Sequence, residues 1–347
     1  ASSVILSTML GLSYKLSVII VAVVVTVYSI MGGLWSVTLT DFVQVFLIII
    51  GMMAAVPFAL SHAGGVEAVI QNVPKESLNL FAGYDFFGIL SLVIMYVGTF
   101  SVGQEAVSRF YAARDEKAAK QGAWLAALLN FIYAFIPTVL GLIVLALINM
   151  GKFYADEFAS VGARYALPIL AIRTMPAIIC GLLFSGVISA TMSSSDSDLL
   201  GAGSIFANDI FKIFLNPNAS SKEVMNVTKI TMVLVGIASM FIALFNTQSI
   251  VSILMFCFTL RAAGSFFPYV LGHFWKKAST AGTIASLVLG TITVVYLEHV
   301  SKGMLFGIHF SQAIIPGLVA AFFGFMVFSI LMPPAKEGTE LAEEADD

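Results

Sequence analysis

The sequence predicts an all-α protein that crosses a membrane many times. Of its 347 residues, 59% are hydrophobic, 11% are charged and 29 are phenylalanine, which is far from the composition of a water-soluble domain. Several apolar runs reach the roughly 20 residues that a helix needs to cross the hydrocarbon core. The alternating pattern of a membrane barrel is absent, so we expect helical spans in contact with a lipid bilayer.

The apolar runs predict one short helix followed by spans with short connections. The short helix is expected at 1–11, and the spans near 15–32, 36–61, 86–110, 121–149, 170–213, 226–246, 249–273, 279–297 and 311–332. The longest loops, 62–85 and 150–169, are too short for a soluble or catalytic domain. One membrane domain is therefore predicted.

The two ends of the chain carry different signals. It opens with ASSVILSTML, without an initiator methionine and already inside an apolar run, so we expect further helices of the natural protein to precede it. Ten of the 17 lysine and arginine residues fall in loops 109–120, 212–229 and 275–277 or in the tail. Positive residues favour the cytoplasmic side, so the C-terminus is predicted to be cytoplasmic.

Charge and histidine content argue against two other classes of protein. The net charge is −3, and much of the acid lies in the tail 333–347, so nothing indicates a nucleic-acid partner. The four histidines fall near span ends and match no metal-site spacing, so the chain is not expected to be an enzyme. We expect the protein to be a monomer or a weakly associated homo-oligomer.

The most polar stretch within an apolar span is SATMSSSDSD, residues 189–198. Ala190, Ser193, Ser194 and Ser197 are three and four residues apart, so they share one helix face. Hydroxyl and carbonyl oxygens stacked in this way are hard ligands that suit Na⁺. Back-bonding to the helix and close helix packing would also explain the pattern.

Two further spans carry polar groups that need an explanation. Asp41 lies in VTLTDFVQVFL, where it is either a functional carboxylate or a residue at the membrane boundary. Gly98 and Gly103 bracket Thr99 and Ser101, and Gln104 follows directly. Two glycines this close favour either an unwound helix of the kind that transporters use for solute, or a small-residue packing face.

Asn130 and Arg261 are lone polar residues in apolar spans. Asn130 favours a hydrogen bond to another helix. Arg261 has three open interpretations: it pairs with Asp41, Glu105 or Asp196, it binds a solute carboxylate, or it extends to the membrane surface.

Four motifs, in order and spacing, resemble the sodium:solute symporter family of bacterial sodium/proline and sodium/galactose transporters. They are YSIMGGLWSVTLTDFVQVFLIIIG, GTFSVGQEAVSRFYAARD, SGVISATMSSSDSDLLGAGSIFANDIFK and FPYVLGHFWKKASTAGTIASLVLG. The likeness covers essentially the whole chain. It implies a bacterial multi-pass protein of the cytoplasmic membrane.

The resemblance also implies a fold, the five-plus-five inverted-repeat transporter core with two peripheral C-terminal helices. On this map the first repeat is incomplete, and its first two core helices are expected to precede the chain. The implied segments are the end of the first repeat at 1–61 (the end of core helix 3, and core helices 4 and 5), an outer loop at 62–85, the second repeat at 86–273 (core helices 6–10), two peripheral helices at 274–332 and an acidic tail at 333–347.

The same resemblance implies where sodium binds. The main site falls on the Ala190 carbonyl and the Ser193 and Ser194 hydroxyls. A possible second site falls on Asp41, Ser193, Asp196 and Ser197, where Asp196 replaces a serine of certain members.

The implied function is Na⁺-coupled symport of a small organic solute into the cell by alternating access. SVGQ at the sixth core helix is closer to the proline type, and Asn130 replaces a lysine of the sugar type. An amino acid or small carboxylate is therefore favoured, with Thr99, Ser101, Gly103, Gln104, Asn130 and Arg261 as the candidates for solute binding or gating. The alternatives are a sodium/sugar symporter and a transporter-like membrane sensor module.

Overall fold

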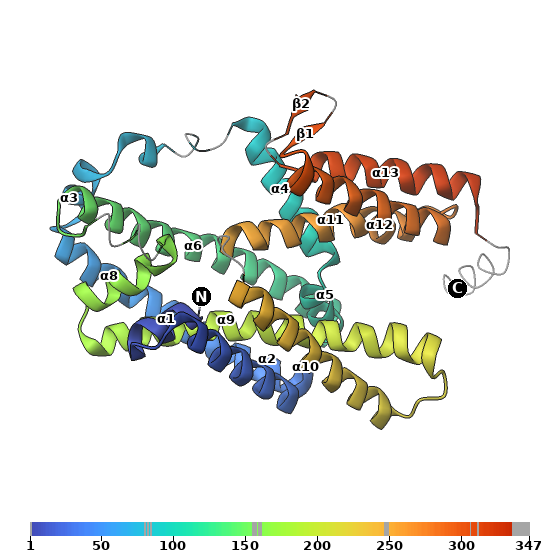
Figure 1. Cartoon of the computed structure of the whole chain (residues 1–347), viewed down its shortest axis with the longest axis horizontal. Coiled ribbons are helices and arrows are strands. Elements are labelled where there is room, and N and C mark those ends of the chain that lie inside the picture. Colours follow the sequence, from blue (N-terminus) through green and yellow to red (C-terminus); the bar gives the residue numbers. More distant parts are fainter. Residues whose placement is uncertain are drawn as a thin grey trace. The chain divides into compact units, whose positions relative to one another are not determined.

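The structure is a computed structural model of an almost entirely helical chain (Figure 1). It describes residues 2–334 except 80, 82, 84, 155–157, 159–161, 246–249, 306 and 311, and at 33–36 and 309 it describes the backbone alone. The expected acidic tail lies outside the described residues from 335 onward. Two compact units are formed, one by 1–79 and 113–248 and the other by 80–112 and 249–347.

The first unit is built from long helices with short connecting turns. Its elements are α1 Ser2–Leu10, α2 Tyr14–Ala63, α3 Val66–Asn72, the 3-10 helix η1 Lys75–Leu78, α6 Glu116–Asn149, the 3-10 helix η2 Ala163–Tyr165, α8 Ala166–Thr174, α9 Ala177–Ile205, the π-helix η3 Phe206–Leu215 and α10 Ser221–Phe245.

The second unit contains a bent helix pair and a helical bundle. Its elements are α4 Phe86–Val102, α5 Gln104–Tyr111, α11 Ile250–Phe274, α12 Thr280–Val295, the π-helix η4 Tyr296–Val300, the antiparallel strands β1 Met304–Leu305 and β2 Ile308–His309, and α13 Ile314–Leu331. Within it, α11, α12 and α13 lie side by side (Figure 1).

Among the described residues, eight helices are long and apolar enough to cross a membrane, and the bent pair α4–α5 would be a ninth. This agrees with the number of expected spans and confirms the all-α membrane fold. A lipid environment requires that backbone N–H and C=O groups bond within the protein, and a helix satisfies all of them within one segment.

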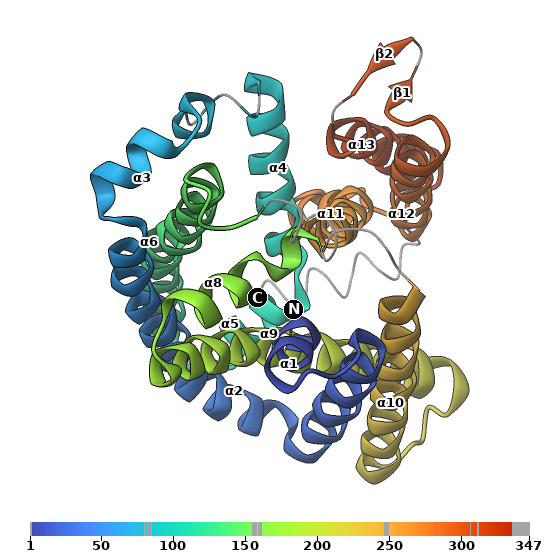
Figure 2. The same ribbon diagram turned by 60° about the vertical axis from the view of Figure 1, so that its left-hand side comes forward.

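One of the expected helix boundaries was wrong. The spans expected at 15–32 and 36–61 are present as two candidate membrane spans, Tyr14–Gly32 and Val37–Ala63, joined without a break in the helical backbone of α2, because adjacent glycines weaken a helix without removing a backbone donor. Its ribbon curves along its length (Figure 2). The span expected at 170–213 is divided, since α8 ends at Thr174 and α9 begins after Pro176. Proline disfavours the helical conformation of the residue before it, and Met175 is extended, with φ −119° and ψ 146°.

The bent pair begins and ends as its sequence suggests. Asp85 caps α4 by accepting a hydrogen bond from the Gly88 amide at 2.8 Å. Gly103 separates α4 from α5 with φ −71° and ψ 120°, and the two helices differ in direction by 48°. Gly98, by contrast, lies inside an unbroken part of α4. The expected break is therefore present at one of the two glycines.

The first unit is held together by a core between α2, α6, α8 and α9. Ala55, Ala59, Ile143, Leu147 and Leu183 are fully buried there. Small residues let α2 and α9 approach closely, as is common in membrane helices.

Gly186 of α9 shows how close this approach is. A Cβ atom at this position would lie 2.8 Å from the Leu47 carbonyl oxygen of α2 and 3.3 Å from the Ile48 Cα. Gly181, on the same helix, has no atom within 4 Å of the corresponding point. Substitutions at these two glycines therefore distinguish the effect of close packing from the effect of helix propensity.

We predict that Gly186→Ala destabilises the protein and that Gly181→Ala does not. Forcing a methyl group between two backbones costs about 1–3 kcal/mol, whereas replacing an unconstrained helical glycine gains up to about 1 kcal/mol. Thermal unfolding of the purified protein in detergent measures both effects. Equal unfolding midpoints for the two variants would contradict this packing.

Candidate functional site

Several hydroxyls in the polar stretch of α9 bond to the helix itself. Ser195 donates to the Thr191 carbonyl at 2.8 Å, and Ser197 donates to the Ser193 carbonyl at 3.1 Å. Such bonds give a serine inside an apolar helix an acceptor on its own helix. The back-bonding expected as one explanation of this stretch is therefore present.

The three atoms expected to form the main sodium site lie on one turn of α9. Ser194 donates to the Ala190 carbonyl at 3.2 Å, and its side chain is exposed. Ser193 is half-buried and donates to Asp41 instead, with 2.5 Å between Oγ and Oδ1. The structure thus places the Ser194 hydroxyl against the Ala190 carbonyl and the Ser193 hydroxyl against a carboxylate of α2.

Asp41 and Ser193 join two helices that are far apart in sequence. Asp41 lies in α2 and is half-buried, so the bond from Ser193 is charge-assisted and screened by little solvent. Thr40, the preceding residue, accepts a hydrogen bond from the Tyr28 hydroxyl at 2.6 Å. The structure therefore brings together two members of the expected second site.

Asp196, another member of that expected set, bonds to different residues. It is fully buried, and its Oδ1 accepts a hydrogen bond from the Ser29 hydroxyl of α2 at 2.5 Å. The Tyr28 hydroxyl lies nearby, while Oδ2 has no hydrogen-bond partner among the described residues. Ser29 and Tyr28 were not predicted from the sequence, because nothing in an apolar run marks the helix face that meets Asp196.

The residues expected around the helix break differ in their surroundings. Thr99 is fully buried, and its hydroxyl has no hydrogen-bond partner among the described residues. Ser101 donates to the Val97 carbonyl at 2.7 Å, Gly103 is buried and Gln104 is exposed. The two hydroxyls therefore differ, since that of Ser101 is satisfied by its own helix and that of Thr99 is not.

Arg261 and Asn130 both have partners in the structure. Arg261 of α11 forms an ion pair with Glu105 of α5, with Nη1 and Oε1 2.5 Å apart. Of the three carboxylates considered for it, Glu105 is the one it contacts. Asn130 is exposed and donates to the Ala126 carbonyl of its own helix at 2.9 Å, so the interhelical bond expected for it is not seen.

The chemistry of these groups fits a hard cation better than a transition metal. Among the described residues, no group of three or more His, Cys, Asp or Glu side chains could hold a metal ion. Hydroxyl, carbonyl and single carboxylate oxygens are the ligands that alkali and alkaline-earth ions prefer. The face between α2 and α9 offers all three.

Comparison with known proteins identifies relatives along most of the chain. A sequence model of the sodium:solute symporter family matches residues 1–290. A solved structure of a Na⁺-coupled sialic acid symporter, in a substrate-bound outward-open state, has the same fold, with a TM-score of 0.72 and 21% identity. That similarity covers 96% of this chain and 71% of the other.

Two curated relatives are similar over almost the whole chain. The osmoregulated proline transporter OpuE of Bacillus subtilis is 27% identical over 95% of this chain and 66% of its own length. The sodium/pantothenate symporter of Haemophilus influenzae is 26% identical over 97% of this chain and 68% of its own length. The chain thus spans about two thirds of the length of these relatives, which are transporters and not enzymes.

We predict that Ser29 and Asp196 are energetically coupled. Ser29→Ala should lower the free energy of unfolding by about 1–3 kcal/mol, because it leaves a buried carboxylate oxygen unpaired. In an Asp196→Ala background the same change should cost less than about 0.5 kcal/mol. Denaturation of the purified variants measures this double-mutant cycle.

Ser17→Ala is the matched control for that cycle. Ser17 is a fully buried serine of the same helix, and its hydroxyl donates to the Ser13 carbonyl. It should show no coupling to Asp196. A Ser29–Asp196 coupling no larger than that of Ser17 would mean that the buried bond contributes nothing.

Proposed function

Because the chain belongs to the sodium:solute symporter family, we propose that the protein is a Na⁺-coupled symporter that moves a small organic solute across the membrane by alternating access. The observation that carries this proposal is the group of oxygen atoms on the turn of α9 from Ala190 to Ser194, next to a carboxylate of α2. Polar groups at such a place in a membrane helix are costly and usually functional.

The main sodium site uses the Ala190 carbonyl and the Ser193 and Ser194 hydroxyls. The Ser194 Oγ and the Ala190 carbonyl oxygen are 3.2 Å apart, which is long for a hydrogen bond. Breaking this bond therefore costs little free energy when the hydroxyl rotates so that both oxygens face a cation. Three oxygens are fewer than the five or six that a small cation prefers, so other segments supply the remaining ligands.

A second sodium ion binds beside the first, at Asp41, Ser193 and Ser197. Asp41 supplies the negative charge, and Ser193 is shared by both sites, so binding of one ion positions a ligand of the other. Asp196 belongs to this site only after its bond to Ser29 breaks.

Ion binding drives transport if it stabilises one of two states. A ligand shifts a conformational equilibrium by its difference in affinity for the two states, and the coupling between ion and solute is reciprocal. Sodium that orders α9 against α2 favours the outward-open state, and low cytosolic sodium allows release. The solute is an amino acid or another small carboxylate, with Thr99, Ser101, Gly103, Gln104, Asn130 and Arg261 as binding or gating residues.

The remaining proposals concern the organisation of the chain. Residues 1–61 form the end of the first inverted repeat, 62–85 an outer loop, 86–273 the second repeat and 274–332 two peripheral helices. The protein resides in the bacterial cytoplasmic membrane with its C-terminus in the cytoplasm, as a monomer or weak homo-oligomer without nucleic acid. Labelling of single cysteines at 114 and 336 from each side of a sealed vesicle tests this orientation.

We predict that Ser193→Ala combined with Ser194→Ala raises the sodium concentration for half-maximal uptake at least about tenfold. Loss of two hydroxyl ligands to a charged ion exceeds the 1.4 kcal/mol that corresponds to a factor of ten. Solute uptake by the natural-length protein in proteoliposomes, titrated with NaCl at constant ionic strength, measures this change.

Ser195→Ala is the control for the sodium site. Its hydroxyl lies on the same helix and donates to the Thr191 carbonyl, so its loss should leave the sodium dependence unchanged. Uptake that is indifferent to sodium in the wild-type protein would refute the proposed function. An unchanged sodium dependence in the double variant would refute the site.

A further inference from the structure

The helix break in the second unit lies under an ion pair. Gly103 is buried between α4 and α5, and a Cβ atom there would lie 2.9 Å from the Glu105 Oε1 and 3.0 Å from the Arg261 Nη1. The two charged side chains therefore lie directly against the backbone at the break. A larger residue here would displace the ends of these two side chains, while the backbone angles at Gly103 are open to any residue.

The ion pair has unused hydrogen-bonding capacity. A guanidinium carries five N–H donors in a planar fork, and among the described residues one of them is bonded, to Glu105. Glu105 and Arg261 are 22% and 32% exposed, so neither side chain is fully covered by the rest of the chain. One turn before the break, the buried Thr99 hydroxyl also has no partner among the described residues.

An aromatic group adjoins the guanidinium. The Arg261 Cζ lies 5.9 Å from the centre of the Phe258 ring, and Phe258 makes edge contacts with Tyr96 and Phe100. Tyr96 and Phe100 are 42% and 48% exposed. Aromatic rings in this arrangement offer an apolar surface for a carbon skeleton and a negative face for an ammonium group.

We propose that the Glu105–Arg261 pair opens to bind the solute, and that the solute is a zwitterion. Its carboxylate accepts from Arg261 in the bidentate geometry that a guanidinium favours, and its ammonium group takes the place of Arg261 beside Glu105. This inference rests on the proposed transport function and names the solute class for it.

The charge balance distinguishes a zwitterion from other solutes. A zwitterion exchanges one ion pair for two and leaves no charge unpaired. An anion would leave Glu105 without its partner, and a cation would do the same to Arg261, which is costly in a partly desolvated site. A neutral sugar carries no charge that could replace either partner of the Glu105–Arg261 ion pair.

The test compares four charge classes for binding to the natural-length protein in saturating NaCl. The zwitterions are L-proline, L-alanine and glycine betaine, and pantothenate, choline and glucose represent the anionic, cationic and neutral classes. Thermal stabilisation should occur with at least one zwitterion and with none of the other three. Stabilisation by none of the zwitterions, or more strongly by another class, overturns the proposal.

Variants then locate the binding. Arg261→Gln and Glu105→Gln should each weaken the affinity for the bound zwitterion at least about tenfold, and Arg261→Lys should restore part of it. The double variant Glu105→Gln with Arg261→Gln leaves no unpaired charge, so it should fold and still fail to bind. Unchanged affinity in that double variant contradicts the assignment.

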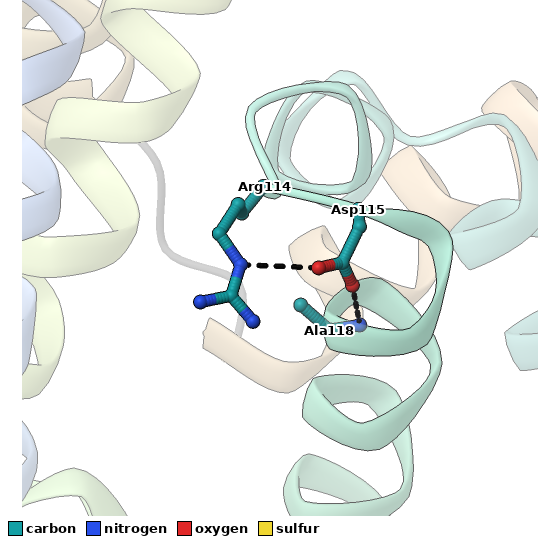
Figure 3. Close-up of polar contacts among 3 residues, drawn as sticks. All are labelled: Arg114, Asp115 and Ala118. Atoms are coloured by element: carbon teal, nitrogen blue, oxygen red, sulfur yellow. Dashed lines mark hydrogen bonds and ion pairs between the residues drawn. The ribbon is translucent and has the colours of Figure 1, made fainter.

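Arg114→Gln is the matched control, because Arg114 also forms an ion pair with an acidic residue. It contacts Asp115, which caps α6 through the Ala118 amide (Figure 3). The Arg114 side chain is 89% exposed, and a surface pair of this kind contributes little. This variant should bind the zwitterion as the wild type does, and a matching loss of affinity would overturn the proposal.

The two proposals fail in different ways. Sodium-dependent uptake of pantothenate, choline or glucose, with no effect of zwitterions, would leave the transport function intact and remove the solute assignment. Zwitterion binding that is lost in the double variant, without any sodium dependence of uptake, would remove the coupling and leave the solute site.

Discussion

The hydroxyl and carboxylate oxygens between α2 and α9 need hydrogen-bond partners from the protein, and this need determines how the two helices pack in the first unit. Both helices are apolar enough to cross a membrane, where an unsatisfied polar group costs several kcal/mol. Each helix therefore supplies partners to the other. Ser193 bonds to Asp41, and Ser29 bonds to Asp196, so α9 is tied to α2 at two points.

The close packing of these helices follows from the same condition. Gly186 leaves the α2 backbone within van der Waals reach of α9, which keeps the short polar side chains in contact. A hydroxyl that donates its hydrogen to its own helix still has lone pairs with which it can bind a cation. A face that is satisfied without an ion and better satisfied with one is suited to reversible ion binding.

Much of this structure could be predicted from the sequence, because membrane helices are long and their polar residues conspicuous. The apolar runs predicted the number of spans, and the serine spacing predicted one oxygen-rich face. A break between Gly98 and Gly103 was one of two interpretations of these close glycines, and the structure has it at Gly103. The division at Pro176 was missed, although a proline there disfavours a helical Met175.

The partners of individual side chains could not be predicted in the same way. At about 100° per residue, Asp196 lies about 60° away from Ser193 on the helix, on the side opposite to Ser197, and so faces Ser29 and not Asp41. Which residues of α2 meet it depends on the crossing of the two helices. Arg261 had three possible carboxylate partners in sequence, and the break at Gly103 brings Glu105 to it.

The central claim is that these oxygens bind sodium, and equilibrium stability tests it without a known solute. A ligand that binds the folded state stabilises it by about 2.7 kcal/mol at 100 times its dissociation constant. The unfolding midpoint of the purified natural-length protein should therefore rise saturably with NaCl, but not with KCl at equal ionic strength, and Asp41→Asn combined with Ser194→Ala should abolish the difference. Identical midpoints in the two salts for the wild-type protein would contradict a sodium site between α2 and α9.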